Sequence, residues 1–197
     1  MEKNVLGLTL PTDPRWVNIA EMNLKEILVD HAYCEQKAAS ACISLIIQFP
    51  EKTEMVEQVV PLVAEEWAHF ERVLEKLKER GWSLGHARKD EYVEKISRLV
   101  LKGGSRDQLL SERLLINALI EARSCERFRL LWKEIGDKDL SLFYYDLMVS
   151  EAGHYKTFLK LACNYQPKVV IDRRWKEILS DEAEILKGLT LRADRMH

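Results

Sequence analysis

The tetrapeptide Glu151-Ala-Gly-His154 decides the fold that this sequence predicts, together with an earlier copy of its pattern, Glu66-Trp-Ala-His69. On a helix, residues three apart lie on one face, about one turn from each other. Each tetrapeptide therefore directs a carboxylate and an imidazole toward the same point. Two such pairs on different helices would hold two metal ions if two further helices each supplied a facing glutamate. The prediction requires four long helices and two more glutamates.

The composition is that of a helical protein. The 197 residues include only eight glycines and five prolines, and residues of high helix propensity are plentiful. A chain of this length buries a core of its own, so we expect one domain, residues 1–197. The formal net charge of −2 gives no global positive field that would attract a nucleic acid, although a local basic surface remains compatible with it.

Cysteine usage and hydropathy indicate a cytoplasmic protein. The cysteines form no C-x-x-C pair, and three of them fall in apolar helical patterns, where a free cysteine behaves as a small buried hydrophobe. No basic region followed by an apolar run opens the chain, and no uncharged run reaches the roughly 20 residues of a membrane span. We therefore expect a soluble, cytoplasmic protein without a membrane partner.

Periodic apolar seams predict four long helices. These span residues 23–49, 53–81, 105–136 and 139–164. Thr53 and the capping box Ser105-x-x-Gln108 are expected to start the second and third of them. Gly81 is expected to end the second helix, because glycine suits the left-handed position after a helix, and Gly136 is expected to end the third.

Additional elements are shorter. Asp13-Pro14 predicts the start of a short helix. The connection over 82–104 is expected to contain another helix at about 90–101. Asp172 is expected to cap a last helix that ends at about Gly188. The residues beyond this helix are expected to be loose. Pro61 lies inside the second long helix and predicts a kink there, or a tolerated proline near a helix start.

Each predicted helix pair carries one more inward glutamate at a matching depth. Glu35 and Glu66 lie at similar distances from the turn at Pro50, and Glu121 and Glu151 do so around Gly136. The connection over 82–104 is long enough to climb the about 45 Å of a crossover between parallel second and third helices. The sequence therefore predicts an all-α, ferritin-like four-helix bundle with a long crossover between the second and third long helices.

Four buried carboxylates near one another would repel unless cations neutralised them, so a metal-free core is the poorer alternative. The predicted metal ligands are Glu35, Glu66, His69, Glu121, Glu151 and His154. Oxygen and nitrogen donors with open positions suit iron or manganese better than zinc. Two reduced irons can bind and cleave O2, but the fold does not choose among iron storage, peroxide reduction and hydroxylation.

Glu126 competes with Glu121 for the ligand position on the third helix. Cys34-Glu35 and Cys125-Glu126 are locally alike, which favours Glu126, whereas the apolar seam favours Glu121. Glu121 is the predicted ligand, and Glu126 is expected to pair with an arginine or to line an entrance. Two aspartates, Asp30 and Asp146, lie about one and a half turns before a ligand glutamate. They could support the ligands, but solvated side chains are the expectation.

Longer strings around these residues resemble the tRNA hydroxylase family MiaE, over nearly the whole chain. The strings are Asp30-His-Ala-Tyr-Cys-Glu-Gln-Lys-Ala-Ala39, Glu65-Glu-Trp-Ala-His-Phe70, Glu121-Ala-Arg-Ser-Cys-Glu-Arg-Phe128 and Ser150-Glu-Ala-Gly-His-Tyr155. The resemblance implies a non-haem di-iron monooxygenase that uses O2 to hydroxylate the isopentenyl side chain of methylthio-isopentenyl-adenosine beside the tRNA anticodon. It also implies that Glu66 and Glu151 bridge the two irons, that Glu35 and Glu121 are terminal ligands, and that His69 and His154 bind one iron each.

The resemblance makes the tRNA anticodon loop the expected substrate, with an unidentified electron donor. Basic residues that could contact phosphates are Lys76, Lys78, Arg80, Arg88, Lys89, Arg123, Arg127, Arg129, Lys133, Arg173 and Arg174, although each group could equally be a solvated helix face. The alternative function is a ferritin-like di-iron protein that acts on a small molecule or serves as a ferroxidase. A non-catalytic helical interaction protein would bind no stoichiometric metal.

Overall fold

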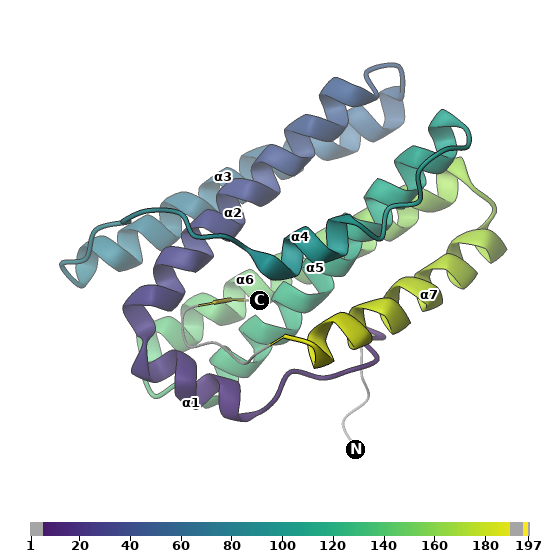
Figure 1. Cartoon of the computed structure of the whole chain (residues 1–197). Coiled ribbons are helices and arrows are strands. Elements are labelled where there is room, and N and C mark those ends of the chain that lie inside the picture. Colours follow the sequence, from purple (N-terminus) through teal and green to yellow (C-terminus); the bar gives the residue numbers. More distant parts are fainter. Residues whose placement is uncertain (1–5, 190–194, 197) are drawn as a thin grey trace. The chain divides into compact units, whose positions relative to one another are not determined.

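The computed structural model describes residues 6–189, 195 and 196, and it confirms the all-α prediction. The helices in this described part are α1 (Arg15–Met22), α2 (Leu24–Gln48), α3 (Thr53–Glu79), α4 (Glu91–Ser97), α5 (Arg106–Glu134), α6 (Lys138–Tyr165) and α7 (Lys168–Lys187). Within the same ranges, no helix combines the length and the apolar character that crossing a membrane requires. The chain divides into two compact units (Figure 1). The α2/α3 unit holds residues 16–89, 195 and 196, and the α5/α6 unit holds residues 6–15 and 90–189.

In the α2/α3 unit, two long helices run antiparallel, side by side (Figure 1). Pro50 disfavours helical geometry at Phe49, so α2 ends there. The backbone N–H of Lys52 donates to the Phe49 carbonyl at 3.0 Å and closes the turn. The seam between the helices buries apolar side chains, and these include Leu28, Leu45, Val59, Val73 and Leu77.

The ends of α3 follow the predictions in part. Thr53 is its first helical residue and not its cap, because Lys52 occupies the capping position and no side chain there bonds to the helix start. Gly81 has a φ of 70°, which confirms its predicted left-handed conformation. Pro61 lies within α3, and the kink expected there stays a prediction.

The α5/α6 unit forms a second antiparallel pair (Figure 1). The predicted capping box is present: Ser105 Oγ accepts from the backbone N–H of Gln108, whose side chain accepts from the backbone N–H of Ser105. The helix ends at Glu134, slightly before Gly136. Asp137 caps α6, because its side chain accepts from the backbone N–H groups of Asp139 and Leu140. Ring contacts such as Phe128 with Tyr144, 5.5 Å between centroids, fill the seam.

Two further helices belong to the α5/α6 unit. Asp90 caps α4 through the backbone N–H of Val93. The prediction that Asp172 caps α7 is wrong, because the helix begins directly after Pro167. Proline has its φ already set for a helix and loses no hydrogen bond at a helix start. Asp172 instead accepts from Lys168 Nζ at 2.6 Å, one turn earlier on the helix surface.

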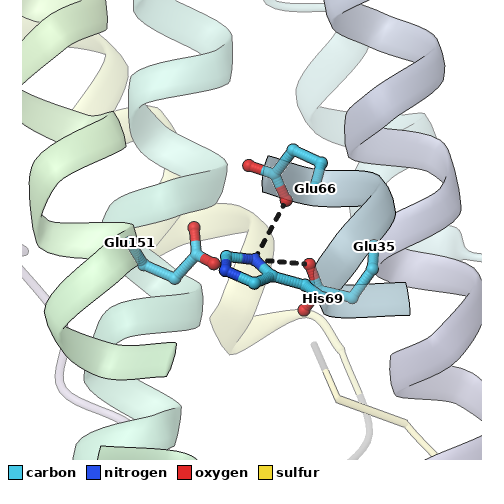
Figure 2. A group of neighbouring side chains, drawn as sticks. All are labelled: Glu35, Glu66, His69 and Glu151. Atoms are coloured by element: carbon cyan, nitrogen blue, oxygen red, sulfur yellow. Dashed lines mark ion pairs between the residues drawn. The ribbon is translucent and has the colours of Figure 1, made fainter. Parts of the chain in front are cut away.

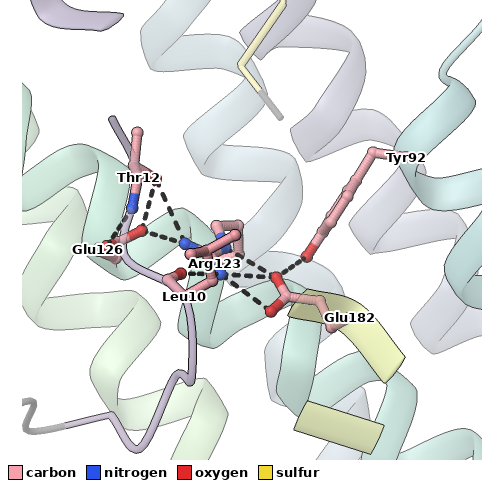
Figure 3. Close-up of polar contacts among 6 residues, drawn as sticks. All are labelled: Leu10, Thr12, Tyr92, Arg123, Glu126 and Glu182. Carbon is pink, nitrogen blue, oxygen red and sulfur yellow. Dashed lines mark hydrogen bonds and ion pairs between the residues drawn. The ribbon is translucent and has the colours of Figure 1, made fainter. Parts of the chain in front are cut away.

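A buried charged network joins α4, α5, α7 and the N-terminal segment within this unit (Figure 3). The guanidinium of Arg123 is fully buried and donates twice to the Glu182 carboxylate, at 2.9 Å each. Tyr92 Oη donates to the same carboxylate at 3.0 Å, and Arg123 also donates to the carbonyl of Leu10. The network attaches the shorter elements to the helix that carries Glu121.

The expectation of a loose C-terminus is wrong for the residues beyond α7 that the structure describes. Arg195 and Met196 are buried and belong to the α2/α3 unit. Arg195 Nη1 donates to the Asp30 carboxylate at 2.9 Å, and the backbone N–H of Met196 donates to it at 2.8 Å. Trp16 Nε1 donates to the Arg195 carbonyl. The ion pair of Arg195 and the burial of the Met196 side chain thus offset the entropic cost of ordering these two residues.

Candidate metal centre

The α2/α3 unit brings three of the predicted ligands together. We call Glu35 of α2 with Glu66 and His69 of α3 the α2/α3 triad. Each of the three offers one ligand atom, and these atoms lie within 4.8 Å of one another. His69 Nδ1 is 3.6 Å from one oxygen of Glu35 and 3.6 Å from one oxygen of Glu66 (Figure 2). Because ligand atoms lie about 2.0–2.6 Å from a bound divalent cation, one cation can contact all three.

A fourth side chain, His31, contacts this triad. His31 lies one turn before Glu35 on α2 and is fully buried, and its Nε2 is 2.6 Å from the second Glu35 oxygen. His31 is not among the ligands predicted from the sequence. The signal that could have found it is the spacing, because residues four apart on a helix face each other.

The α5/α6 unit contains the same donor set. We call Glu121 of α5 with Glu151 and His154 of α6 the α5/α6 triad, whose ligand atoms also lie within 4.8 Å of one another. His154 Nδ1 is 3.3 Å from a Glu151 oxygen. Burial, with the negative charge of Glu151, raises the pKa of the nearby Cys125 thiol to about 12. Cys125 therefore stays protonated, and it donates to the Met148 carbonyl instead of adding a thiolate to the triad.

The donor sets fit a hard or borderline cation. All six residues are at least 94% buried, and each triad places two carboxylates and one imidazole within the reach of one ion. Two ionised carboxylates this close and this buried repel strongly unless a positive charge lies between them. Mixed glutamate and histidine donors suit iron and manganese better than softer metals.

Glu126, the competitor of Glu121, lies in a different setting. It accepts from the backbone N–H and the hydroxyl of Thr12 at 2.9 and 2.6 Å, and from Arg123 at 2.5 Å. Its carboxylate is thus engaged with the N-terminal segment and an arginine, whereas Glu121 lies with Glu151 and His154. The assignment of Glu121 as the ligand remains a prediction, and this arrangement favours it.

The two aspartates differ from each other. Asp146 is exposed, as expected. Asp30 is only 3% exposed and forms the ion pair with Arg195, so the expectation that it is solvated is wrong. The side chain lies next to His31 in the chain, and it accepts hydrogen bonds from Arg195 and Met196 near the C-terminus. Its role is to fix this part of α2.

Several of the basic residues considered for phosphate contacts are not on the surface. Arg123 and Arg127 are buried, and burial together with the nearby charge of Arg123 lowers the pKa of Arg127 to about 10. Arg174 donates to Glu112 at 2.8 Å, and Arg88 donates to Glu26. Arg123, Arg174 and Arg88 therefore stabilise the fold, because each is paired with a glutamate within the chain. Exposed members of the set include Lys78, Lys133 and Arg173.

Comparisons with known proteins agree with one another. A family model described as tRNA-(MS[2]IO[6]A)-hydroxylase (MiaE) matches residues 2–197. A tRNA 2-(methylsulfanyl)-N(6)-isopentenyladenosine(37) hydroxylase of Pseudomonas putida is 36% identical over 92% of this chain and 87% of its own length. The protein of the same name from Salmonella typhimurium is 27% identical over 79% of this chain and 74% of its own.

A solved structure is similar as well. It is described as protein 43 with aldehyde deformylating oxygenase activity from Synechococcus, with a TM-score of 0.91 and 35% identity, and the match covers 96% of this chain and 94% of that one. A likeness of this extent, together with the family model, confirms the predicted ferritin-like fold class.

Proposed function

The chain belongs to the MiaE family of tRNA hydroxylases, and on this premise we propose that it hydroxylates the isopentenyl group of methylthio-isopentenyl-adenosine beside the tRNA anticodon. The observation that carries the proposal is that the chain matches this family over residues 2–197 and also has two buried triads of identical donor type. The enzyme would work in the cytoplasm, where tRNA is modified.

We propose that each triad binds one iron. Glu35, Glu66 and His69 would hold one ion, and Glu121, Glu151 and His154 would hold the other. Each unit would then supply two carboxylates and one imidazole. A pair of reduced irons supplies O2 activation to such a site.

The overall reaction inserts one oxygen atom into a C–H bond. The substrate C–H becomes C–OH, the second atom of O2 leaves as water, and the balance requires two electrons and two protons from an external donor. The chain's own residues bind the metals and exclude water, since all six predicted ligands are buried. A dry site prevents the oxidising equivalents from being lost to solvent.

The solved relative from Synechococcus is named for an activity on aldehydes, so a small-molecule substrate is the competing function. The family model and both curated relatives carry tRNA hydroxylase names, and this agreement favours tRNA. Assays of both substrates separate the two functions. Conversion of an aldehyde without any hydroxylated nucleoside would overturn the tRNA proposal.

The decisive experiment combines metal analysis with mass spectrometry of nucleosides. Purified protein is expected to hold about two irons per chain, and tRNA from cells that lack the protein is expected to lose the hydroxylated, methylthiolated adenosine. Glu66→Ala and His154→Ala are expected to lose iron and to leave the tRNA unhydroxylated. Glu65→Ala is the matched control, because Glu65 is the exposed neighbour of Glu66.

A second pair of variants tests the ligand choice on α5. Glu121→Ala is expected to lose bound iron, whereas Glu126→Ala is expected to keep two irons per chain and to lose stability instead, because its bonds to Thr12 and Arg123 are structural. Full hydroxylation by a metal-free variant would end the di-iron proposal. Iron loss in Glu126→Ala, with normal iron in Glu121→Ala, would exchange the two assignments.

A further inference from the structure

We propose that His31 is a positioning residue for Glu35, and that it makes the two metal positions of this enzyme inequivalent. His31 binds one oxygen of the Glu35 carboxylate and thereby leaves the other oxygen to the metal position of the α2/α3 triad. The inference rests on the proposed di-iron function and adds a residue outside the predicted ligand set.

The two oxygens of Glu35 face different partners. Oε1 lies 2.6 Å from His31 Nε2, whereas Oε2 lies 3.6 Å from His69 Nδ1 within the triad. An ionised carboxylate only accepts hydrogen bonds, so Nε2–H of His31 is the donor. A charge-assisted bond of this length is among the stronger hydrogen bonds in proteins. One oxygen is thus engaged, and Glu35 is directed to bind a metal through the other.

Burial makes this bond restrictive. His31 is fully buried and Glu35 is 4% exposed, so neither side chain can exchange its partner for water. Both lie on one face of α2, one turn apart. The same part of α2 is fixed by the neighbouring Asp30, which accepts from Arg195 and from the backbone of Met196. The carboxylate orientation is therefore set before any metal arrives, which reduces the cost of binding.

The α5/α6 triad has a different residue at the corresponding position. Asn117 lies one turn before Glu121 and is partly exposed, whereas His31 is fully buried. An amide on a shorter side chain near solvent does not restrict a carboxylate in the way a buried imidazole does. The donor sets of the two triads are alike, and the residue one turn before the first glutamate of each triad differs in type and in burial.

Cobalt(II) titration, followed by calorimetry and absorption, tests the proposal without any turnover. The parent protein is expected to bind two Co²⁺ per chain. His31→Leu is expected to weaken one of the two sites about 10- to 100-fold, as loss of a residue that orients a metal ligand does. His31→Gln keeps an N–H donor within reach of Glu35 and is expected to restore that site to within about threefold of the parent, since the oriented bond is retained.

Leu28→Ala is the matched control for loss of core packing. Leu28 is a fully buried apolar residue of the same helix, and its truncation is expected to lower the melting temperature while both Co²⁺ affinities remain unchanged. If His31→Leu does not fold, His31→Phe replaces it, because a planar ring fills the same space without a donor.

The outcomes separate the inference from the proposed function. Failure of the parent to bind Co²⁺ would overturn the di-metal function itself. If folded His31→Leu or His31→Phe binds two Co²⁺ with the affinities of the parent, the role of His31 is overturned while the di-metal function stands. Equal weakening in His31→Gln and His31→Leu, or equal weakening in Leu28→Ala, would likewise overturn that role, because the bond to Glu35 would not be the cause.

Discussion

The α2/α3 triad and the α5/α6 triad share one donor pattern, but different interactions support them. In the first, Glu35 is bonded by His31, and α2 is fixed by the pair between Asp30 and Arg195. In the second, support comes from Arg123, which follows Glu121 on α5 and attaches three other segments to this helix. The comparison teaches that a repeated ligand pattern does not imply repeated surroundings.

The difference follows from what covers each helix pair. Within the α5/α6 unit, α4 and α7 pack on the long helices and bury charged groups that need partners. In the α2/α3 unit, Arg195 near the C-terminus is buried and pairs with Asp30 of α2. A buried charge without its partner is costly, so we expect each unit to be most sensitive at its own charged contact.

The largest effect is expected in the α5/α6 unit, from Arg123→Met. The substitution leaves Glu182 fully buried without its guanidinium partner, and such a loss costs about 3–5 kcal/mol of unfolding free energy. Denaturant unfolding measures the cost, and hydrogen exchange should show lost protection in α4 and α7. A double variant, Arg123→Met with Glu182→Met, is expected to recover part of the stability.

The control for this variant is Arg173→Met, because Arg173 is an exposed arginine of α7. Its unfolding free energy is expected to stay within about 0.5 kcal/mol of the parent. Equal protection losses in both units after Arg123→Met would contradict the separate supports described above.

A smaller effect is expected from Asp30→Asn in the α2/α3 unit. The variant keeps the shape of the side chain but removes the charge that accepts from Arg195 and Met196, and hydrogen bonds to charged groups contribute about 1.5–3 kcal/mol. Asp146→Asn, at the corresponding place before Glu151, is the matched control and should change stability by under about 0.5 kcal/mol. Similar costs for the two would show that burial of Asp30 does not matter.

The smallest change in stability is expected from alanine substitutions at two glycines, and its sign should differ between them. Gly81 has a φ of 70° with open space around it, so Gly81→Ala should cost about 1 kcal/mol from backbone strain alone. Gly153 is helical, exposed and equally open, so Gly153→Ala should stabilise metal-free protein by about 0.5–1 kcal/mol. Thermal unfolding of both variants measures the signs. Two changes of the same sign would contradict the assigned backbone conformations.

Local sequence signals predicted much of the fold, because each depends on residues a few positions apart. The capping box at Ser105 and the left-handed Gly81 were predicted from short patterns and are present. The predicted caps Thr53 and Asp172 were wrong, because several residues near a helix start compete for the same role and Pro167 was sufficient to start α7.

Long-range electrostatics could not be predicted from spacing. Arg123 and Arg127 lie in a stretch that contains several polar residues. No residue nearby in the sequence indicates that Arg123 will form a buried ion pair with Glu182. The same holds for Asp30, whose partner Arg195 is close to the other end of the chain. A charged residue is exposed by default, and only a distant partner makes its burial favourable.

The sequence by itself determined the helical class, the two Glu-x-x-His pairs and the choice of glutamates that could accompany them, since helical periodicity places these residues on one face. Tertiary structure alone decided which glutamates and histidines lie within reach of one cation inside each unit, and that His31 holds Glu35. It also decided that Glu126 serves the N-terminal segment. These outcomes depend on packing between helices and on which buried charges find partners, and neither is encoded in local spacing.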